Sequence, residues 1–527
     1  MHVVRLALAG RVLARHGVVV AGNGIALPTL ARLALRLARL RLPFARNDAA
    51  RAGDHRARLS AALVSLGPSY VKLGQFLATR PDVVGAQTAA DLSELQDRLP
   101  PFSRELALEE VRRGLGAEPD ELFEEIGPPV AAASIAQVHR GRTREPGGAG
   151  RDVAIKILRP AIEQRFARDL ASFEFAARMI ERIHQPSRRL RPVDAVATLA
   201  RSVQLEMDLR MEASAIAEMA HNTRDDPGFR VPEVDWQRTS RRVLTTEWID
   251  GIPLGRLDDL RAAGHDLAGL AETIIQSFLR HAMRDGFFHA DMHQGNLFVD
   301  TAGNVVAVDF GIMGRLSPKD RRFLAEILHG FITRDYSRVS KVHFDAGYVP
   351  SHQSPEVFAQ ALRAIGEPLM DRDAEDISMG RLLAQLFEVT EQFDMHTQPQ
   401  LLLLQKTMVV VEGVARTLNP RLNMWSTSAP VVEEWMQQRL GPEARLTEAG
   451  ESASSLGRFV ADLPELLEGV GRAAHMFSHM AEHGGLRLDS HTVEALAAAR
   501  ARRAWTTRLA LWICATALVL IAIGTLA

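Results

Sequence analysis

The chain has 527 residues, with 63 Lys and Arg against 64 Asp and Glu, and a single cysteine, Cys514. This length exceeds what one compact core can organise and predicts two or three domains. The balanced charge argues against nucleic acid as a main partner. One cysteine excludes a disulfide framework and a metal site built from cysteines.

The first 50 residues read as a basic amphipathic segment. Residues 1–46 contain eight Arg and no acidic residue, and their apolar clusters are too short to span a bilayer. The pattern is typical of a segment that lies on an anionic membrane surface. A solvated arm, or a helix packed on the body of the protein, fits the pattern equally well.

Residues 51–127 predict a helical extension that contains an unusual glycine. Lys72, Gly74 and Gln75 form a Lys-x-Gly-Gln motif inside an amphipathic helix, although glycine in a helix costs roughly 1 kcal/mol relative to alanine. A helical glycine commonly admits a close neighbour, so we expect tight packing against Gly74.

From Pro128 the pattern changes to strands, which opens a region predicted to run over residues 128–250. Residues 153–158 read as a buried Val-Ala-Ile-Lys-Ile-Leu strand around Lys156, in a chain with only five lysines. In protein kinases, the lysine of a V-A-I-K strand binds the α- and β-phosphates of ATP.

An alanine-rich loop stands where a kinase has its glycine-rich loop. Alanine does not readily adopt the left-handed backbone with which glycine amides wrap a phosphate. We therefore expect the nucleotide to be held differently, next to a loop made of Ala131, Ala132, Ala133 and Ser134.

Acidic residues in the predicted helical stretch 161–221 are candidates to orient the strand lysine. In one continuous helix, Asp208 and Glu212 would share a face, whereas Glu206 would point about 200° away from Asp208. We expect Glu212 to pair with the strand lysine, which leaves Glu206 free for another partner.

Residues 243–251 predict a strand that runs out into a turn, like the hinge between kinase lobes that binds adenine. Backbone groups from Glu247 to Ile249 would then face the base. The strand would close the region predicted to end at residue 250.

The strongest motif lies in residues 287–311. Asp291 is followed five positions later by Asn296, and Asp309 of an Asp-Phe-Gly follows thirteen positions after that. Protein kinases space their catalytic Asp, its Asn and their metal-binding Asp in this way. Asp291 is therefore expected to act as a base or to orient water, and Asn296 and Asp309 to bind Mg²⁺. A predicted hairpin over 297–308 would bring the last two together.

The sequence after Gly311 lacks the platform that a protein substrate needs. Ser317 already reads as the N-cap of a helix with proline at its first position, so no long activation segment fits. Ala290 also replaces the arginine of H-R-D. A predicted second lobe runs over residues 251–440. The apolar stretch 401–414 is interrupted by polar residues and favours a core helix over a membrane span.

The C-terminus differs from the rest of the chain. A predicted helical linker over 441–504 precedes residues 509–527, which are nineteen uncharged residues after a run of arginines and Trp505. This length and positive flank predict a transmembrane anchor over 505–527, with the catalytic body on the cytoplasmic side.

Together these motifs resemble the UbiB (AarF-like) family of atypical kinase-like proteins, over residues 66–425. The Lys-x-Gly-Gln and the alanine-rich loop are its most specific signs. The chain departs from the family at Met292 and Gln294, where the family usually has proline, and in having one predicted terminal span where many bacterial members have two.

The resemblance implies an α+β, two-lobed, protein-kinase-like fold with an N-terminal helical extension across the cleft and a C-terminal transmembrane helix. It implies ATP and Mg²⁺ as cofactors, and support of ubiquinone biosynthesis at the bacterial inner membrane. The implied partners are membrane lipids and ubiquinone precursors or biosynthetic proteins. In this interpretation Lys72 pairs with Glu206, and the pair gates the cleft. A non-catalytic nucleotide-binding scaffold and a protein kinase remain the alternatives. Flavin-dependent hydroxylation has no support, because the sequence has no strand-linked G-x-G-x-x-G.

Overall fold

The structure, a computed structural model, describes residues 2–16, 18, 55–78, 99–183, 191–370 and 399–440, with a few positions in 80–95 and 388–395. Contacts divide the chain into two units, residues 1–437 and 438–527. The predicted linker and the predicted anchor lie outside the described residues. None of the helices that the structure describes has the length and apolarity to cross a bilayer.

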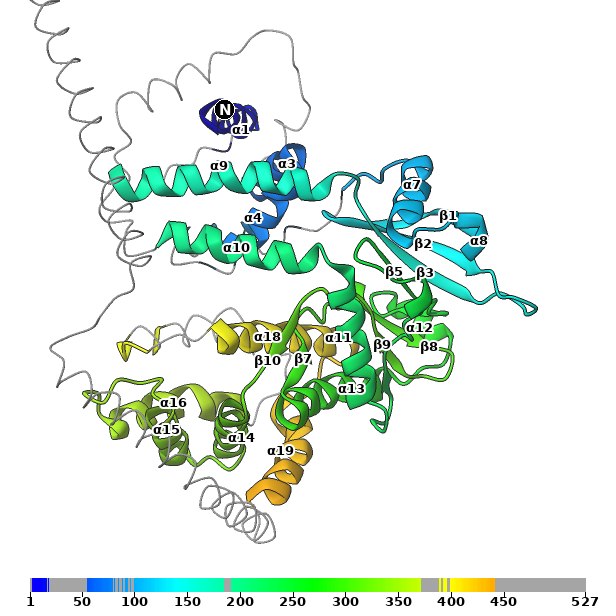
Figure 1. Ribbon diagram of the computed structural model, residues 1–527. Coiled ribbons are helices and arrows are strands. Elements are labelled where there is room, and N and C mark those ends of the chain that lie inside the picture. The colour runs from blue at the N-terminus through cyan, green and yellow to red at the C-terminus, as the bar shows by residue number, and fades with distance from the viewer. Residues whose placement is uncertain are drawn as a thin grey trace, which may run out of the picture. The chain divides into compact units, whose positions relative to one another are not determined.

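A four-stranded antiparallel sheet forms the first lobe (Figure 1). Its third strand lies between two neighbours, so Val138 and Leu244 flank Lys156 in register. The strands begin at Phe123, five residues before the predicted change at Pro128, because Phe123 is buried in a cluster with α7 (Arg104–Leu115). In sheet order the strands are β1 (Phe123–Ala132), β2 (Ala136–Thr143), β3 (Asp152–Leu158) and β5 (Val243–Glu247), with the short α8 (Pro119–Leu122) before them in the chain.

Three helices occupy the stretch that the sequence predicted as one helical region. α10 ends at Glu206, and Asp208 caps the next helix by accepting a hydrogen bond from the backbone N–H of Arg210. The prediction that Asp208 and Glu212 share a helix face is therefore wrong, because Asp208 lies outside the helix. The three are α9 (Ile162–Ile183) and α10 (Pro192–Glu206), which run side by side in Figure 1, and α11 (Leu209–Asn222).

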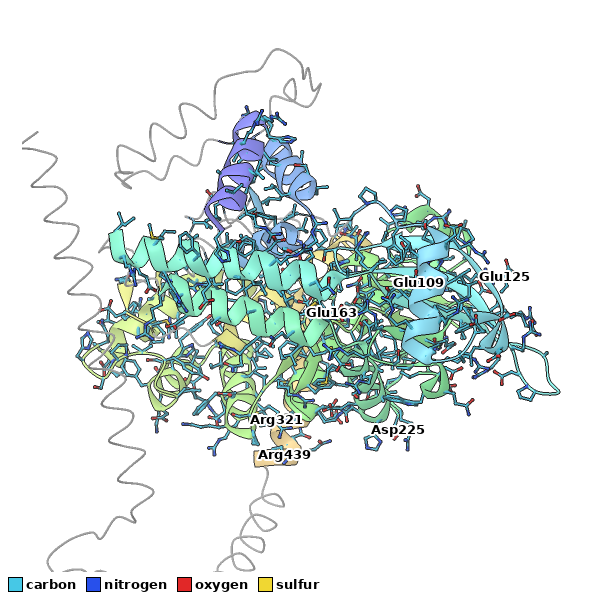
Figure 2. The ribbon with its side chains drawn as sticks, turned by 45° about the horizontal axis from the view of Figure 1, so that its top comes forward. Glu109, Glu125, Glu163, Asp225, Arg321 and Arg439 are labelled. Atoms are coloured by element: carbon cyan, nitrogen blue, oxygen red, sulfur yellow. The ribbon has the colours of Figure 1, made fainter. Side chains whose placement is uncertain are left out.

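A partly buried arginine, Arg242, links the sheet to two helices of this lobe. Arg242, just before β5, binds Glu110 of α7 at 2.7 Å and Glu163 of α9 at 2.5 Å. Figure 2 labels Glu163 on α9. Glu110 is 2 % exposed, so its charge needs this partner to remain in the interior.

The N-terminal extension packs on α9 and on the core of the molecule. Val71 of α4 is buried in a cluster with α3, whereas Leu73 and Phe76 of α4 pack against the main core. At the chain start, His2 Nδ1 lies 3.2 Å from Ser172 Oγ of α9. The described part of the basic segment is thus a helix packed on the body. The helices are α1 (His2–Arg15), α3 (His55–Leu66) and α4 (Pro68–Ala78).

The second lobe begins with short strands that carry the predicted catalytic motifs. β8 and β9 form the predicted hairpin, and β7 pairs with β10 on either side of it in the chain. The strands are β4 (Phe229–Arg230), β6 (Gly251–Pro253), β7 (Phe287–His289), β8 (Leu297–Asp300), β9 (Val305–Ala307) and β10 (Met313–Arg315). One sheet has the order β4-β9-β8-β6.

Helices complete this lobe around the main apolar core and a separate, smaller cluster that includes Tyr336 and Phe358. α18 (Pro399–Leu418) is the predicted core helix, with Leu404, Val411 and Ala415 buried. Ser317 caps α14, as predicted. The other helices are α12 (Leu257–Ala262), α13 (Leu267–Arg280) with a π-helical turn at His281–Asp285, α14 (Pro318–Ile332), α15 (Tyr336–Asp345), α16 (Pro355–Met370) and α19 (Met424–Leu440).

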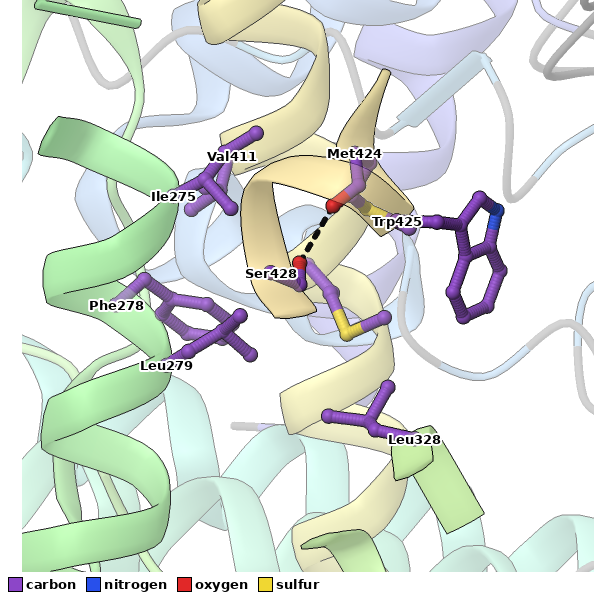
Figure 3. A pocket seen from close by; sticks show the side chains of 9 residues that line it. Ile275, Phe278, Leu279, Leu328, Val411, Met424, Trp425 and Ser428 are labelled. Atoms are coloured by element: carbon purple, nitrogen blue, oxygen red, sulfur yellow. Dashed lines mark hydrogen bonds between the residues drawn. The ribbon is translucent and has the colours of Figure 1, made fainter. Parts of the chain in front are cut away.

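A small cavity lies among these helices, away from the predicted catalytic residues. Its walls are apolar side chains of α13, α14, α18 and α19, among them Phe278, Val411 and Trp425 (Figure 3). The one hydroxyl in its wall, that of Ser428, donates to the Met424 carbonyl at 2.6 Å. The cavity is therefore a packing gap of the core and offers no free polar group for chemistry.

Candidate active site

Lys156 binds two carboxylates at the junction of the lobes. Its Nζ lies 2.7 Å from Glu212 Oε1 and 2.9 Å from Asp309 Oδ1. Burial disfavours the ammonium, but Asp309 and Glu212 outweigh that effect and raise the pKa of Lys156. The predicted pairing of Lys156 with Glu212 is thus present, and the lysine stays charged at neutral pH.

Asp309 has an unusual backbone and an ionised side chain. Its φ is 61°, in the left-handed region that side chains other than glycine rarely adopt. The charge of Lys156, against burial and with help from His289 and Lys72, lowers the pKa of Asp309. The carboxylate is 49 % exposed, so it is both charged and accessible to a cation.

The β8–β9 hairpin brings Asn296 next to the Asp-Phe-Gly segment. Its backbone carbonyl accepts from the Val308 N–H at 2.8 Å, and its side-chain Nδ2 donates to the Asp291 carbonyl at 3.1 Å. Because Nδ2 faces Asp291, the amide oxygen of Asn296 is directed elsewhere and can serve as a ligand.

The donor set suits Mg²⁺. The described residues contain no cluster of three or more His, Cys, Asp or Glu that could hold a metal alone. Mg²⁺, however, is commonly held by one or two protein oxygens together with phosphates and water. Asp309 and Asn296 can supply those oxygens.

His289 was not predicted, although it joins the two halves of the motif. It is fully buried, its Nδ1 accepts from the Asp291 N–H at 3.1 Å, and its Nε2 lies 3.3 Å from the Val308 carbonyl. Burial lowers the pKa of His289, so the ring is neutral and bridges both segments. Its place two residues before Asp291 was the only signal in the sequence.

Helix α18 supports the catalytic loop. Thr407 Oγ1 donates to the Ala290 carbonyl at 3.1 Å, and Gln294 Nε2 donates to Thr417 Oγ1 at 3.1 Å. Met292 is fully buried. At the two positions where the family usually has proline, this chain thus has one core side chain and one hydrogen bond to α18.

The segment after the Asp-Phe-Gly is short, as predicted. Ala290 N–H donates to the Ile312 carbonyl at 3.0 Å, and α14 begins soon after β10. Arg315 of β10 binds Glu218 of α11 through two contacts of 2.8 and 2.6 Å. The stretch is therefore fixed to the helix that carries Glu212.

Lys72 and Glu206 form the predicted ion pair, at 2.5 Å, and each side chain is only 12 % exposed. The predicted tight contact at Gly74 is also present. A Cβ there would lie 2.8 Å from methyl carbons of Leu63 and Leu95. These neighbours belong to the extension, so the glycine permits packing within the extension and not against the nucleotide loop.

The alanine-rich loop is held from both sides. The Ala132 carbonyl accepts from the Leu99 N–H at 3.2 Å, and the Ala133 carbonyl accepts from the guanidinium of Arg159 at 2.8 and 3.0 Å. Ser134 is fully buried. The Ser134 side chain therefore does not face solvent, and contact with a nucleotide would fall to the neighbouring alanines, including the exposed Ala131.

In the predicted adenine-binding hinge, two of the three backbone N–H groups already have hydrogen-bond partners within the protein. The Glu247 N–H donates to the Glu233 carbonyl at 2.8 Å, and the Trp248 N–H donates to the Asp152 carbonyl at 3.2 Å. Among the described residues, the Ile249 N–H has no hydrogen-bond partner. Of these three donors, Ile249 alone remains for a base.

Two family models and several known proteins match this chain in sequence. The ABC1 atypical kinase-like domain matches residues 94–343, and the UbiB helical domain matches residues 362–423. "Probable protein kinase UbiB" of Marinobacter nauticus is 40 % identical over 415 residues, which cover 78 % of this chain and 75 % of the relative. The same-named protein of Pseudomonas aeruginosa is 40 % identical over 74 % of this chain and 73 % of its own length. The chain belongs to the UbiB family.

A solved structure agrees at the level of the fold. The Rv3197–erythromycin complex from Mycobacterium tuberculosis superimposes with a TM-score of 0.51 at 22 % identity, covering 70 % of this chain and 93 % of the other. The α+β kinase-like fold of this UbiB-family chain is thus shared with that protein.

Proposed function

We propose that this UbiB-family protein is a membrane-anchored atypical kinase or ATPase that uses MgATP to support ubiquinone biosynthesis. One observation carries the proposal: Lys156, Glu212 and Asp309 form a closed charge cluster beside a loop that presents Asp291 and Asn296. Phosphoryl transfer needs such a set of phosphate, metal and acceptor groups.

Each residue has a distinct task in this reaction. Lys156 holds the phosphates, and Glu212 keeps its ammonium in place. Asn296 and Asp309 hold Mg²⁺, which when bound neutralises charge on the transferred phosphoryl group. Asp291 takes the proton of the attacking hydroxyl or orients a water molecule.

The acceptor is a small molecule or water, and lipid precursors of ubiquinone are the proposed class. The short segment between Gly311 and α14, together with the alanine at position 290, favours such an acceptor over a protein substrate. A membrane anchor over 505–527 would hold the body on the cytoplasmic face of the bacterial inner membrane, where such lipids are reached.

The extension gates this site. Lys72 binds Glu206 and lies near enough to Asp309 to lower its pKa. The positive charge of Lys72, on the helix that carries the Lys-x-Gly-Gln, would thus act on the carboxylate of the proposed metal site. Its position would slow turnover in the free enzyme until a lipid or protein partner moves it.

Quinone profiling of a deletion strain tests the proposal. A copy with Asp291→Asn should accumulate precursors where the wild-type copy restores ubiquinone, and the purified variant should lose ATP hydrolysis. A strain fully restored by Asp291→Asn would instead identify the protein as a scaffold that needs the nucleotide site only for binding.

A further inference from the structure

A second histidine of the catalytic loop lies beside Asp291 on the solvent side. His293 Nε2 is 3.7 Å from Asp291 Oδ2, and the side chain of His293 is 52 % exposed. His289, the other histidine near Asp291, is buried and has both ring nitrogens engaged by backbone groups. Of the two imidazoles, only that of His293 therefore has a ring nitrogen that is not bound to a backbone group.

The backbone fixes which nitrogen of His293 carries the proton. His293 Nδ1 accepts a hydrogen bond from the Gly295 N–H at 3.0 Å. A ring whose Nδ1 accepts must carry its proton on Nε2. Nε2 thus presents an N–H toward Oδ2 of Asp291.

Because residue 295 is a glycine, the His293 ring has room to lie against its backbone. A Cβ on Gly295 would lie 3.0 Å from Cε1 and 3.1 Å from Nδ1 of His293. Among the described residues, no Lys or Arg forms an ion pair with Asp291. The imidazole is therefore the donor that the structure places against this carboxylate.

We propose that His293 is a positioning residue for Asp291. With substrate bound, its Nε2–H donates to Oδ2 and leaves Oδ1 to receive the proton of the attacking hydroxyl or water. The distance of 3.7 Å exceeds a hydrogen bond, and such contacts commonly tighten only when substrate is bound. The inference rests on the proposed function, because it gives Asp291 the role of base or water-orienting group.

Two substitutions separate this role from simple capping of the turn. In His293→Asn, the amide oxygen can replace Nδ1 as acceptor for Gly295, but the donor toward Asp291 is lost. In His293→Gln, the longer side chain can return an N–H to the position of Nε2 but caps poorly. Steady-state ATP hydrolysis and the MgATP thermal shift are measured for both.

The expected result is a loss of kcat of about tenfold or more for His293→Asn, the scale seen when an orienting partner is removed. His293→Gln should retain most of kcat, and both variants should keep KM and the thermal shift with MgATP. Full activity of His293→Asn with loss in His293→Gln would overturn the inference in favour of capping. Wild-type rates in both variants would overturn it too.

A second measurement tests the contact even if the purified protein shows no ATP hydrolysis. If the wild type hydrolyses no more ATP than Asp291→Asn, the proposed function fails. The contact is then judged by Tm in a double-mutant cycle of His293→Asn and Asp291→Ala with MgATP. Non-additive Tm shifts support a direct contact, whereas additive shifts overturn the inference as well.

Discussion

Asp309 combines a strained backbone with a charge that two lysines stabilise. A left-handed φ of 61° at a residue other than glycine costs on the order of 1 kcal/mol and persists only when neighbours enforce it. Here the Val308 N–H is bound to Asn296, and Phe310 is buried against the ring of His289 with centroids 5.0 Å apart. Both flanking residues are fixed, so Asp309 must project its carboxylate toward Lys156.

Asp309→Asn should remove the stabilisation by MgATP. Asparagine tolerates the left-handed backbone at least as well as aspartate, so the fold should survive while the anionic metal ligand is lost. Thermal-shift titration compares wild type and variant with MgATP, and with ATP plus EDTA as the metal-free control. Equal MgATP shifts in both proteins would refute the metal role of Asp309.

The lowered pKa of Asp309 gives a pH test that needs no ligand. A carboxylate whose folded pKa lies below its unfolded value stabilises the fold above the unfolded pKa of about 3.9 and loses that effect as pH falls through the folded pKa. The Tm difference between wild type and Asp309→Asn should thus stay constant from pH 8 to about pH 5 and shrink only in stronger acid. A difference that vanishes already near neutral pH would contradict the ion pair with Lys156.

At the scale of elements, α4 links the extension to the site. One face is buried with α3, the other packs on the main core, and Lys72 reaches Glu206 at the end of α10. Because α4 is packed on both faces, it can alter the site only if the whole helix shifts. The ion pair is then the part of the contact that a partner could release.

Lys72→Ala should change ATP turnover several-fold, or its response to lipid. The fold should lose about 1–3 kcal/mol, between the values for exposed and buried pairs, because Glu206 is left unpaired and only 12 % exposed. Combining Lys72→Ala with Glu206→Ala is the matched control, since it should restore part of the stability and still lack the gate. Turnover, lipid response and ubiquinone output all at wild-type levels would make the pair merely structural.

Gly74→Leu should destabilise the extension. The side chain would be forced against Leu63 and Leu95, where even a Cβ lies at 2.8 Å, at a cost of roughly 1–3 kcal/mol. Gly74→Ala is the control, because the flexible leucine methyls can move aside and alanine favours the helix. The urea midpoint measures the effect, and an unchanged midpoint for Gly74→Leu would show that the contact is loose.

The elements that sequence predicted well are those with strong local signals. The hairpin after Asn296, the cap at Ser317 and the apolar helix α18 all follow from local pattern. The break before α11 was missed, because a capping Asp208 inside a helical run resembles any other polar residue. The early start at Phe123 and the neighbours of Gly74 depend on tertiary packing, which one sequence does not reveal.

At the scale of the molecule, the sequence predicts that a folded kinase-like body is followed by a membrane anchor over residues 505–527. None of the helices that the structure describes in the body is long and apolar enough to span a bilayer. The proposed anchor at residues 509–527 lies outside the described residues. The arginines before them would face the cytoplasm under the positive-inside rule.

Truncation after Ala504 should release the protein from membranes while leaving MgATP binding intact. Flotation or sedimentation of membranes from cells that express each form measures the effect, with the thermal shift as the control for folding. A truncated protein that still sediments wholly with membranes would assign attachment to the basic residues 1–46.

Hydrogen bonds from α18 and α19 limit how far the chain can be truncated from its C-terminal side. The atypical kinase-like match ends at residue 343, yet Thr407 of α18 bonds the Ala290 carbonyl and Trp435 Nε1 of α19 bonds the Met283 carbonyl at 2.9 Å. Excision at residue 343 would leave both carbonyls without these donors and strip apolar cover from α13. The region that sequence comparison delimits as a kinase-like domain is thus smaller than the unit that packs together, and a fragment expected to fold should extend to about residue 440.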